Sequence, residues 1–133
     1  MGAALRLDRW PVILAEAIEE ARVRPFSWGT HDCATWAFTV AFALRGEAPP
    51  EWAGTYKTEI GAARKLKRHG LALDDLGTAI LGQPLASPLM AQRGDVVFVE
   101  GAYGVCVGRE IAVTGRDGLK LRSMSSALKA WRV

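Results

Sequence analysis

Apolar residues recur at helical spacing in two stretches of the first third of the chain, and these stretches differ in how much of their surface is apolar. From about Arg9 to Arg22 the apolar residues share one face, which predicts an amphipathic helix. Asp8 stands where it can cap this helix, and Pro11 falls in the first turn, where proline is tolerated. From Ala34 to Leu44 nearly every side is apolar, which predicts a buried central helix.

Two further helical segments follow a loop. Thr58 to Arg68 predicts an amphipathic helix that is rich in lysine and arginine, and Gly70 is placed to end it. We interpret these cations as a solvated face; a docking surface for an acidic partner protein is the alternative interpretation. A short fourth helix is expected at residues 71–81 and a loop at 82–88.

The second half of the chain changes to short β-branched runs that glycines separate. We expect three or four strands, at Asp95–Val99, Tyr103–Val107, Glu110–Thr114 and Leu119–Arg122. A final helical turn at Ser125–Lys129 is expected to carry Trp131 back onto the body. Helices first and strands second predict one α+β domain over residues 1–133, in which the central helix packs on a curled antiparallel sheet.

A cysteine stands at the start of the central helix. Thr30 and Asp32 are natural N-caps, so Cys33 falls in the first helical turn. The free amides and the helix dipole favour a thiolate there, as at a cysteine nucleophile. Free cysteines are also among the most buried residue types, so position alone favours a packing role. Both interpretations stay open at this point.

Two short motifs resemble those of a known superfamily. Residues 28–34 (Trp-Gly-Thr-His-Asp-Cys-Ala) and 93–98 (Arg-Gly-Asp-Val-Val-Phe) resemble segments of the NlpC/P60 superfamily of papain-like cysteine peptidases. With the closing Ala-Trp-Arg-Val at 130–133, nearly the whole chain is similar to a small family of phage and prophage tail-region proteins related to NlpC/P60. The resemblance implies a cysteine-bearing helix packed on a sheet, with Cys33 as nucleophile.

The chain departs from the superfamily at the catalytic base. The resemblance implies a histidine at the start of the second strand, and Ala102 occupies that position. The third polar residue of the superfamily would fall near residues 111–114, where Thr114 alone can hydrogen-bond. A cysteine peptidase needs an imidazole beside the sulfur, so this departure favours an inactive domain.

Three other side chains are candidates for the missing role. His31 lies two residues before Cys33, and His69 lies on the basic segment. Tyr103 can donate a hydrogen bond, although its pKa is too high for a general base. None of the three restores the pair of cysteine nucleophile and histidine base that the superfamily uses.

Composition and charge limit the kinds of partner that the sequence predicts. The net charge of +3 is too small and dispersed to indicate nucleic acid. Two cysteines and two histidines match no zinc-site spacing, so we expect no metal and no cofactor, while a disulfide between Cys33 and Cys106 stays open. Residues 1–7 are too short and interrupted for a signal peptide, and no run is long enough to span a membrane, so we expect a cytoplasmic product.

Three hypotheses of function remain. The first is a structural or assembly protein of a phage or prophage tail tip, located in the virion tail and built on an inactive NlpC/P60-like fold. The second is an active peptidoglycan peptidase or amidase, and the third is a small intracellular binding domain. The missing histidine favours the first over the second. Trp10, Trp52 and Trp131 as contact anchors favour the first over the third.

Overall fold

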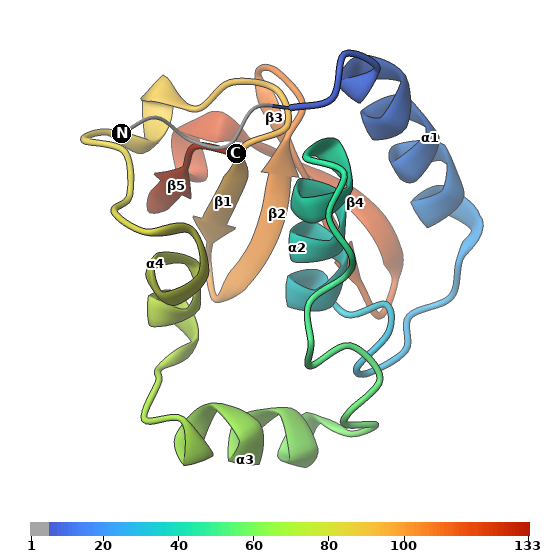
Figure 1. Ribbon diagram of the computed structural model, residues 1–133, viewed down its shortest axis with the longest axis vertical. Coiled ribbons are helices and arrows are strands. Elements are labelled where there is room, and N and C mark those ends of the chain that lie inside the picture. Colours follow the sequence, from blue (N-terminus) through green and yellow to red (C-terminus); the bar gives the residue numbers. More distant parts are fainter. Residues whose placement is uncertain (1–5) are drawn as a thin grey trace.

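The computed structural model describes residues 6–133 and has an α+β architecture (Figure 1). Its helices are α1 (Trp10–Val23), α2 (Cys33–Leu44), α3 (Glu59–Arg68) and α4 (Leu76–Leu81). Its strands are β1 (Val96–Val99), β2 (Ala102–Cys106), β3 (Glu110–Gly115), β4 (Gly118–Ser123) and β5 (Lys129–Trp131). They form one sheet in the order β4-β3-β2-β1-β5 with antiparallel neighbours. The predicted α+β class is confirmed for the described residues.

Alternate side chains of the strands enter two apolar clusters, one on each face of the sheet. The cluster on the α2 side includes Val96, Phe98, Tyr103, Val105, Ala112 and Trp131. The other cluster includes Val97, Val99, Cys106, Ile111, Val113 and Ala130. Because both faces are covered, β1 is buried at all four positions and β2 at all but its first.

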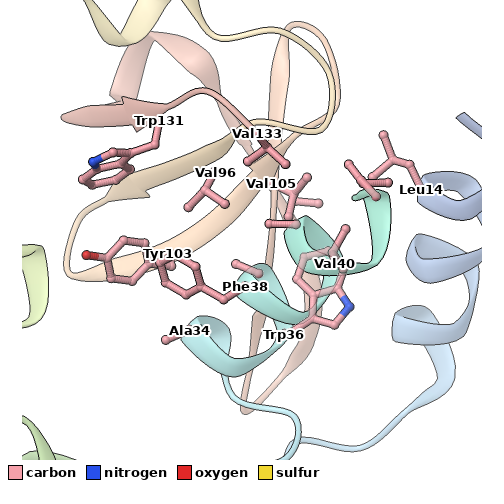
Figure 2. Packing of buried hydrophobic residues seen from close by; sticks show 14 of the residues in the cluster. Leu14, Ala34, Trp36, Phe38, Val40, Val96, Tyr103, Val105, Trp131 and Val133 are labelled. Atoms are coloured by element: carbon pink, nitrogen blue, oxygen red, sulfur yellow. The ribbon is translucent and has the colours of Figure 1, made fainter. Parts of the chain in front are cut away.

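Helix α2 is the centre of the larger cluster, as its uniformly apolar surface predicts. Eight of its twelve residues are buried. Figure 2 shows Phe38 reaching from α2 toward Tyr103 of the sheet, and the two ring centroids are 5.1 Å apart. Burying a side chain of this size contributes roughly 1.5–3 kcal/mol. Helix α1 packs against α2, whereas α4 packs against β5 and α3 lies apart from the sheet (Figure 1).

Asp95 fastens the last strand to the segment before α1. Its carboxylate is fully buried and lies 3.0 Å from the Arg6 guanidinium and 3.1 Å from that of Arg132. It also accepts hydrogen bonds from the amides of Gln92, at 2.8 Å, and Val133, at 3.0 Å. A buried carboxylate with two cations and two amide donors is well satisfied, so this junction holds two distant segments together.

The predicted cap of the first helix is wrong. Arg9 is the N-cap residue and no side chain caps the helix. The amide of Trp10 already donates to Leu7 O, and Val12 and Ile13 both donate to Arg9 O. Pro11 has no amide hydrogen, so the first turn leaves no donor for the Asp8 carboxylate.

The predicted helical turn at Ser125–Lys129 is also wrong. A short 3-10 turn spans Met124–Ser126, and the chain then extends into β5, which pairs with β1. The amide of Leu128 donates to Phe98 O at 2.9 Å, so the free edge of β1 captures this segment. A 3-10 turn at Leu73–Asp75 likewise precedes α4 within the predicted fourth helix.

The tryptophans divide between core and surface. Trp131 returns to the body as predicted and is fully buried, and Trp36 is 6% exposed. The indole of Trp131 donates to Thr78 Oγ1 at 3.2 Å and packs against Gly77 of α4. Trp131 therefore anchors α4 to the sheet and is not an outward contact residue, whereas Trp10 and Trp52 are half-buried.

We expect Gly77→Ala to lower the free energy of unfolding by about 1–3 kcal/mol. A Cβ at Gly77 would lie 2.5 Å from Cζ2 of Trp131, so the indole and α4 would have to move apart. The same change in an open helix gains up to about 1 kcal/mol, so the sign of the effect is informative. Urea unfolding will measure it, with Gly115→Ala as control, because no atom lies within 4 Å of a Cβ there. An unchanged or raised stability of Gly77→Ala would contradict this packing.

Candidate functional site

Cys33 is the first residue of α2, as the sequence predicts. The turn before it closes with a bridge between Ser27 and His31, and Asp32 caps the helix by accepting from the Thr35 amide at 2.8 Å. The side chain of Cys33 is half-buried and packs against both apolar clusters of the sheet. Cys33 therefore stands where α2 meets the sheet.

Burial raises the pKa of the Cys33 thiol. Main-chain groups of Tyr103 and of the first turn of α2 lower it, while the Asp32 carboxylate raises it further. The net direction is upward, so the neutral thiol is favoured at neutral pH. Loss of solvation outweighs the helix terminus that favours a thiolate in the sequence analysis.

The candidate bases lie elsewhere. His31 is 2% exposed and lies in the groove between α1 and α2 with Glu20, Arg24 and Trp36. His69 is the C-cap residue of α3. Within residues 6–133 neither imidazole makes a hydrogen bond to the Cys33 sulfur, and His31 Nδ1 is buried without a hydrogen-bond partner.

Tyr103 holds α4 rather than the cysteine. Its hydroxyl donates to Leu73 O at 2.6 Å and accepts from the Gly77 amide at 3.0 Å. Burial raises the pKa of Tyr103, so its hydroxyl remains a proton donor. The main chain of Tyr103, not its hydroxyl, lies beside the Cys33 sulfur.

The remaining positions implied by the superfamily hold no imidazole. Ala102 begins β2, next to the residue whose main chain meets Cys33. Thr114 on β3 is buried, and its Oγ1 has no hydrogen-bond partner among the described residues. Both cysteines are free; Cys106 is fully buried and its thiol donates to Gly108 O at 3.4 Å.

A buried polar network around Asp32 is the feature that sequence analysis missed. Asp32 Oδ2 accepts from the Gly29 amide at 2.7 Å and from the Tyr56 hydroxyl at 2.6 Å. The Tyr56 hydroxyl also lies 3.1 Å from Thr35 Oγ1, which accepts from the Trp52 indole at 3.2 Å. The loop between α2 and α3 is thereby fastened to the start of α2.

Glycine at position 29 permits this network. Its φ is +85°, and a Cβ there would overlap the carbonyl oxygen of Tyr56. The Gly29 carbonyl in turn accepts from the Gly54 amide at 2.8 Å. A glycine in the turn was therefore a usable sequence signal for close approach of another segment, although it did not identify Tyr56 as that segment.

A cleft of about 140 Å³ lies beside this network and beneath α3. Its walls are mostly apolar. They are formed by Trp28, Asp32, Ala34, Trp52, Tyr56, Ala62, Lys65, Leu66, His69, Leu71, Leu73 and Leu76. An apolar cleft with few polar groups is the usual form of a binding site, so this cleft is the best candidate site of the described chain.

Residues 6–133 lack the features of two other kinds of site. No group of three or more histidine, cysteine, aspartate or glutamate side chains is arranged to hold a metal ion. No helix in the same residues has the length and apolar character needed to cross a membrane.

The chain belongs to the family described as "Domain of unknown function (DUF6950)", whose profile matches residues 5–133. Neither the curated proteins nor the solved structures contain a match to it. The family match spans the helices, the sheet and the cleft together.

We expect slow alkylation of Cys33 by iodoacetamide, with a thiol pKa above the free-thiol value of about 8.5. The reason is the burial of the sulfur without a neighbouring cation or imidazole. Alkylation rates across pH will be measured in a Cys106→Ser background, since a serine hydroxyl can keep the bond to Gly108 O. A thiol pKa well below the free value would contradict this account of Cys33.

Acidification is expected to destabilise the protein through His31. Burial and the Arg24 cation lower the pKa of His31, and the Glu20 and Asp32 carboxylates oppose this only in part. The unfolded chain therefore takes up the proton first as the pH falls through about 6.5. Stability that is complete above this pH is lost below it, as urea unfolding at about pH 7.5 and about pH 5 will measure.

Two histidine variants separate His31 from the other titrating groups. His31→Gln removes the titrating group, so its stability should fall less on acidification than that of the wild type. His69→Gln makes the same substitution at the exposed C-cap residue of α3 and serves as the control for the substitution itself. Equal losses in the wild type and His31→Gln would show that His31 does not cause the effect.

Proposed function

We propose that this chain is a structural or assembly component of a phage or prophage tail, built on a papain-like fold that lacks peptidase activity. The observation that carries the proposal is the set of residues around Cys33. The sulfur lies at the helix start that the superfamily uses for its nucleophile, and Ala102 stands where an imidazole would be required.

The chemistry of amide hydrolysis supports the loss of activity. A cysteine peptidase needs an imidazole to hold the thiolate and to protonate the leaving amine. Here burial raises the pKa of Cys33, and within residues 6–133 no imidazole bonds to its sulfur. His31 lies in the groove between α1 and α2, where Arg24 and Glu20 act on it.

The cleft beneath α3 supports a binding role. It lies beside the start of α2, and its Asp32 and Tyr56 side chains are bonded to one another rather than aimed at a reacting atom. A tail protein that contacts neighbouring proteins would use such a surface. The same cleft also suits the alternative of a small intracellular binding domain, so location in a particle decides between them.

One observation favours the second hypothesis, an active peptidoglycan peptidase. The Cys33 sulfur has main-chain groups of Tyr103 and of the first turn of α2 close by, and these groups lower its pKa. A base supplied by a partner protein would complete such a site. The activity assay therefore uses both the isolated protein and assembled particles.

We expect the purified protein to release no amino groups from peptidoglycan sacculi beyond the background of Cys33→Ala. The physical reason is that a neutral thiol without a base is a poor nucleophile. An active superfamily peptidase serves as the positive control. Release that Cys33→Ala abolishes, by the protein or by particles, would reject the proposal.

The assembly role has its own test. Particles from the phage or prophage that encodes the chain will be separated on a density gradient and probed with an antibody. We expect the chain in the tail-bearing fractions. Its recovery only among free cytosolic proteins would instead favour the small binding domain.

A further inference from the structure

The cleft beneath α3 is an apolar space, and the polar atoms at its α2 end already have hydrogen-bond partners. Its buried polar atoms, Asp32 Oδ2 and the Tyr56 hydroxyl, already bond to each other at 2.6 Å. A polar ligand group inserted beside these two atoms would lose its hydration without gaining either atom as a partner, whereas Lys65 and His69 lie on the wall that α3 forms. The volume of about 140 Å³ is close to that of an apolar cavity that holds benzene. One apolar side chain of phenylalanine or leucine size therefore fits.

Helix α3 forms one wall of the cleft without belonging to the core. None of its residues is buried, and it stands away from the sheet in Figure 1. Its N-terminus is held by Thr58, whose hydroxyl accepts from the Gly61 amide at 3.0 Å. The side chains that face the cleft, Ala62, Lys65, Leu66 and His69, share one helical face.

The charge on α3 is strongly positive and lacks counterions within the described chain. Its acidic residue, Glu59, lies 3.8 Å from Arg116 of the β3–β4 turn. Arg64, Lys65, Lys67 and Arg68 make no ion pair within residues 6–133. Lys65 lies on the cleft wall, and Arg68, three residues on, continues that flank of the helix.

We propose that the cleft receives one apolar side chain from an acidic segment of a neighbouring protein. The apolar side chain enters between Ala62, Leu66 and Trp52, and flanking carboxylates pair with Lys65 and Arg68. The inference rests on the proposed assembly role, because it names the chemistry of the neighbour. The acidic residues of such a segment match the charges of Lys65 and Arg68, and its apolar residue matches the size and apolar walls of the cleft.

Three blocked heptapeptides test the inference. The first has phenylalanine at the centre of six aspartates and glutamates, the second has alanine at the centre, and the third has lysines in place of the acids. Binding to the full chain will be followed by tryptophan fluorescence, since Trp28 and Trp52 line the cleft, and by amide NMR shifts. We expect the first peptide to bind about tenfold more tightly than the other two.

Matched variants localise the binding. Ala62→Phe fills the cleft from α3, whereas Ala63→Phe adds the same ring at an exposed position of the same helix. We expect Ala62→Phe to weaken the first peptide about tenfold and Ala63→Phe to leave it unchanged. Lys65→Glu should also weaken it, and Lys120→Glu on β4 should not. If Ala62→Phe misfolds, the comparison of Lys65→Glu with Lys120→Glu still tests whether the peptide binds at the cleft.

Several results would overturn the inference. The phenylalanine and alanine peptides would bind alike, the basic peptide would bind as well as the acidic one, or both members of a variant pair would respond equally. Failure of this inference is separable from failure of the proposed function. Cys33-dependent hydrolysis rejects the function whatever the peptides do, whereas absent peptide binding without hydrolysis rejects only this docking mode.

Discussion

The carboxylate of Asp32 is the constraint on which the arrangement around α2 depends. It is 2% exposed and accepts three hydrogen bonds, from the Gly29 and Thr35 amides and from the Tyr56 hydroxyl. One oxygen caps the central helix, and the other joins two loops. A buried carboxylate left with fewer donors is costly, so the turn, the helix start and the loop must form together.

The position of Cys33 brings two opposing effects into one place. A helix N-terminus contributes about 0.3–1 kcal/mol toward a negative charge, whereas burial opposes ionisation by more when the sulfur is packed among apolar groups. Burial prevails here and keeps the thiol protonated. The same helix start can thus suit catalysis or packing, and the neighbouring groups decide between them.

The sequence predicted what depends on local periodicity. It identified α2 from its uniform apolar surface, Asp32 as one of two candidate caps and the first four strands to within one residue at each end. It failed where distant segments decide the outcome: β5 forms because the edge of β1 is open, and Tyr56 meets Asp32 across 24 residues. The Asp8 cap failed because main-chain carbonyls already satisfied the first turn of α1.

The placement of α3 outside the core has a consequence for how this domain can change over time. Core substitutions commonly cost about 2–5 kcal/mol, a large share of the stability of a small domain, whereas exposed helical positions are usually within about 0.5 kcal/mol of neutral. Since α3 buries none of its residues, its surface can drift through many sequences while the sheet and α2 stay fixed. The outer surface of α3 is therefore freer to diversify than the sheet and α2.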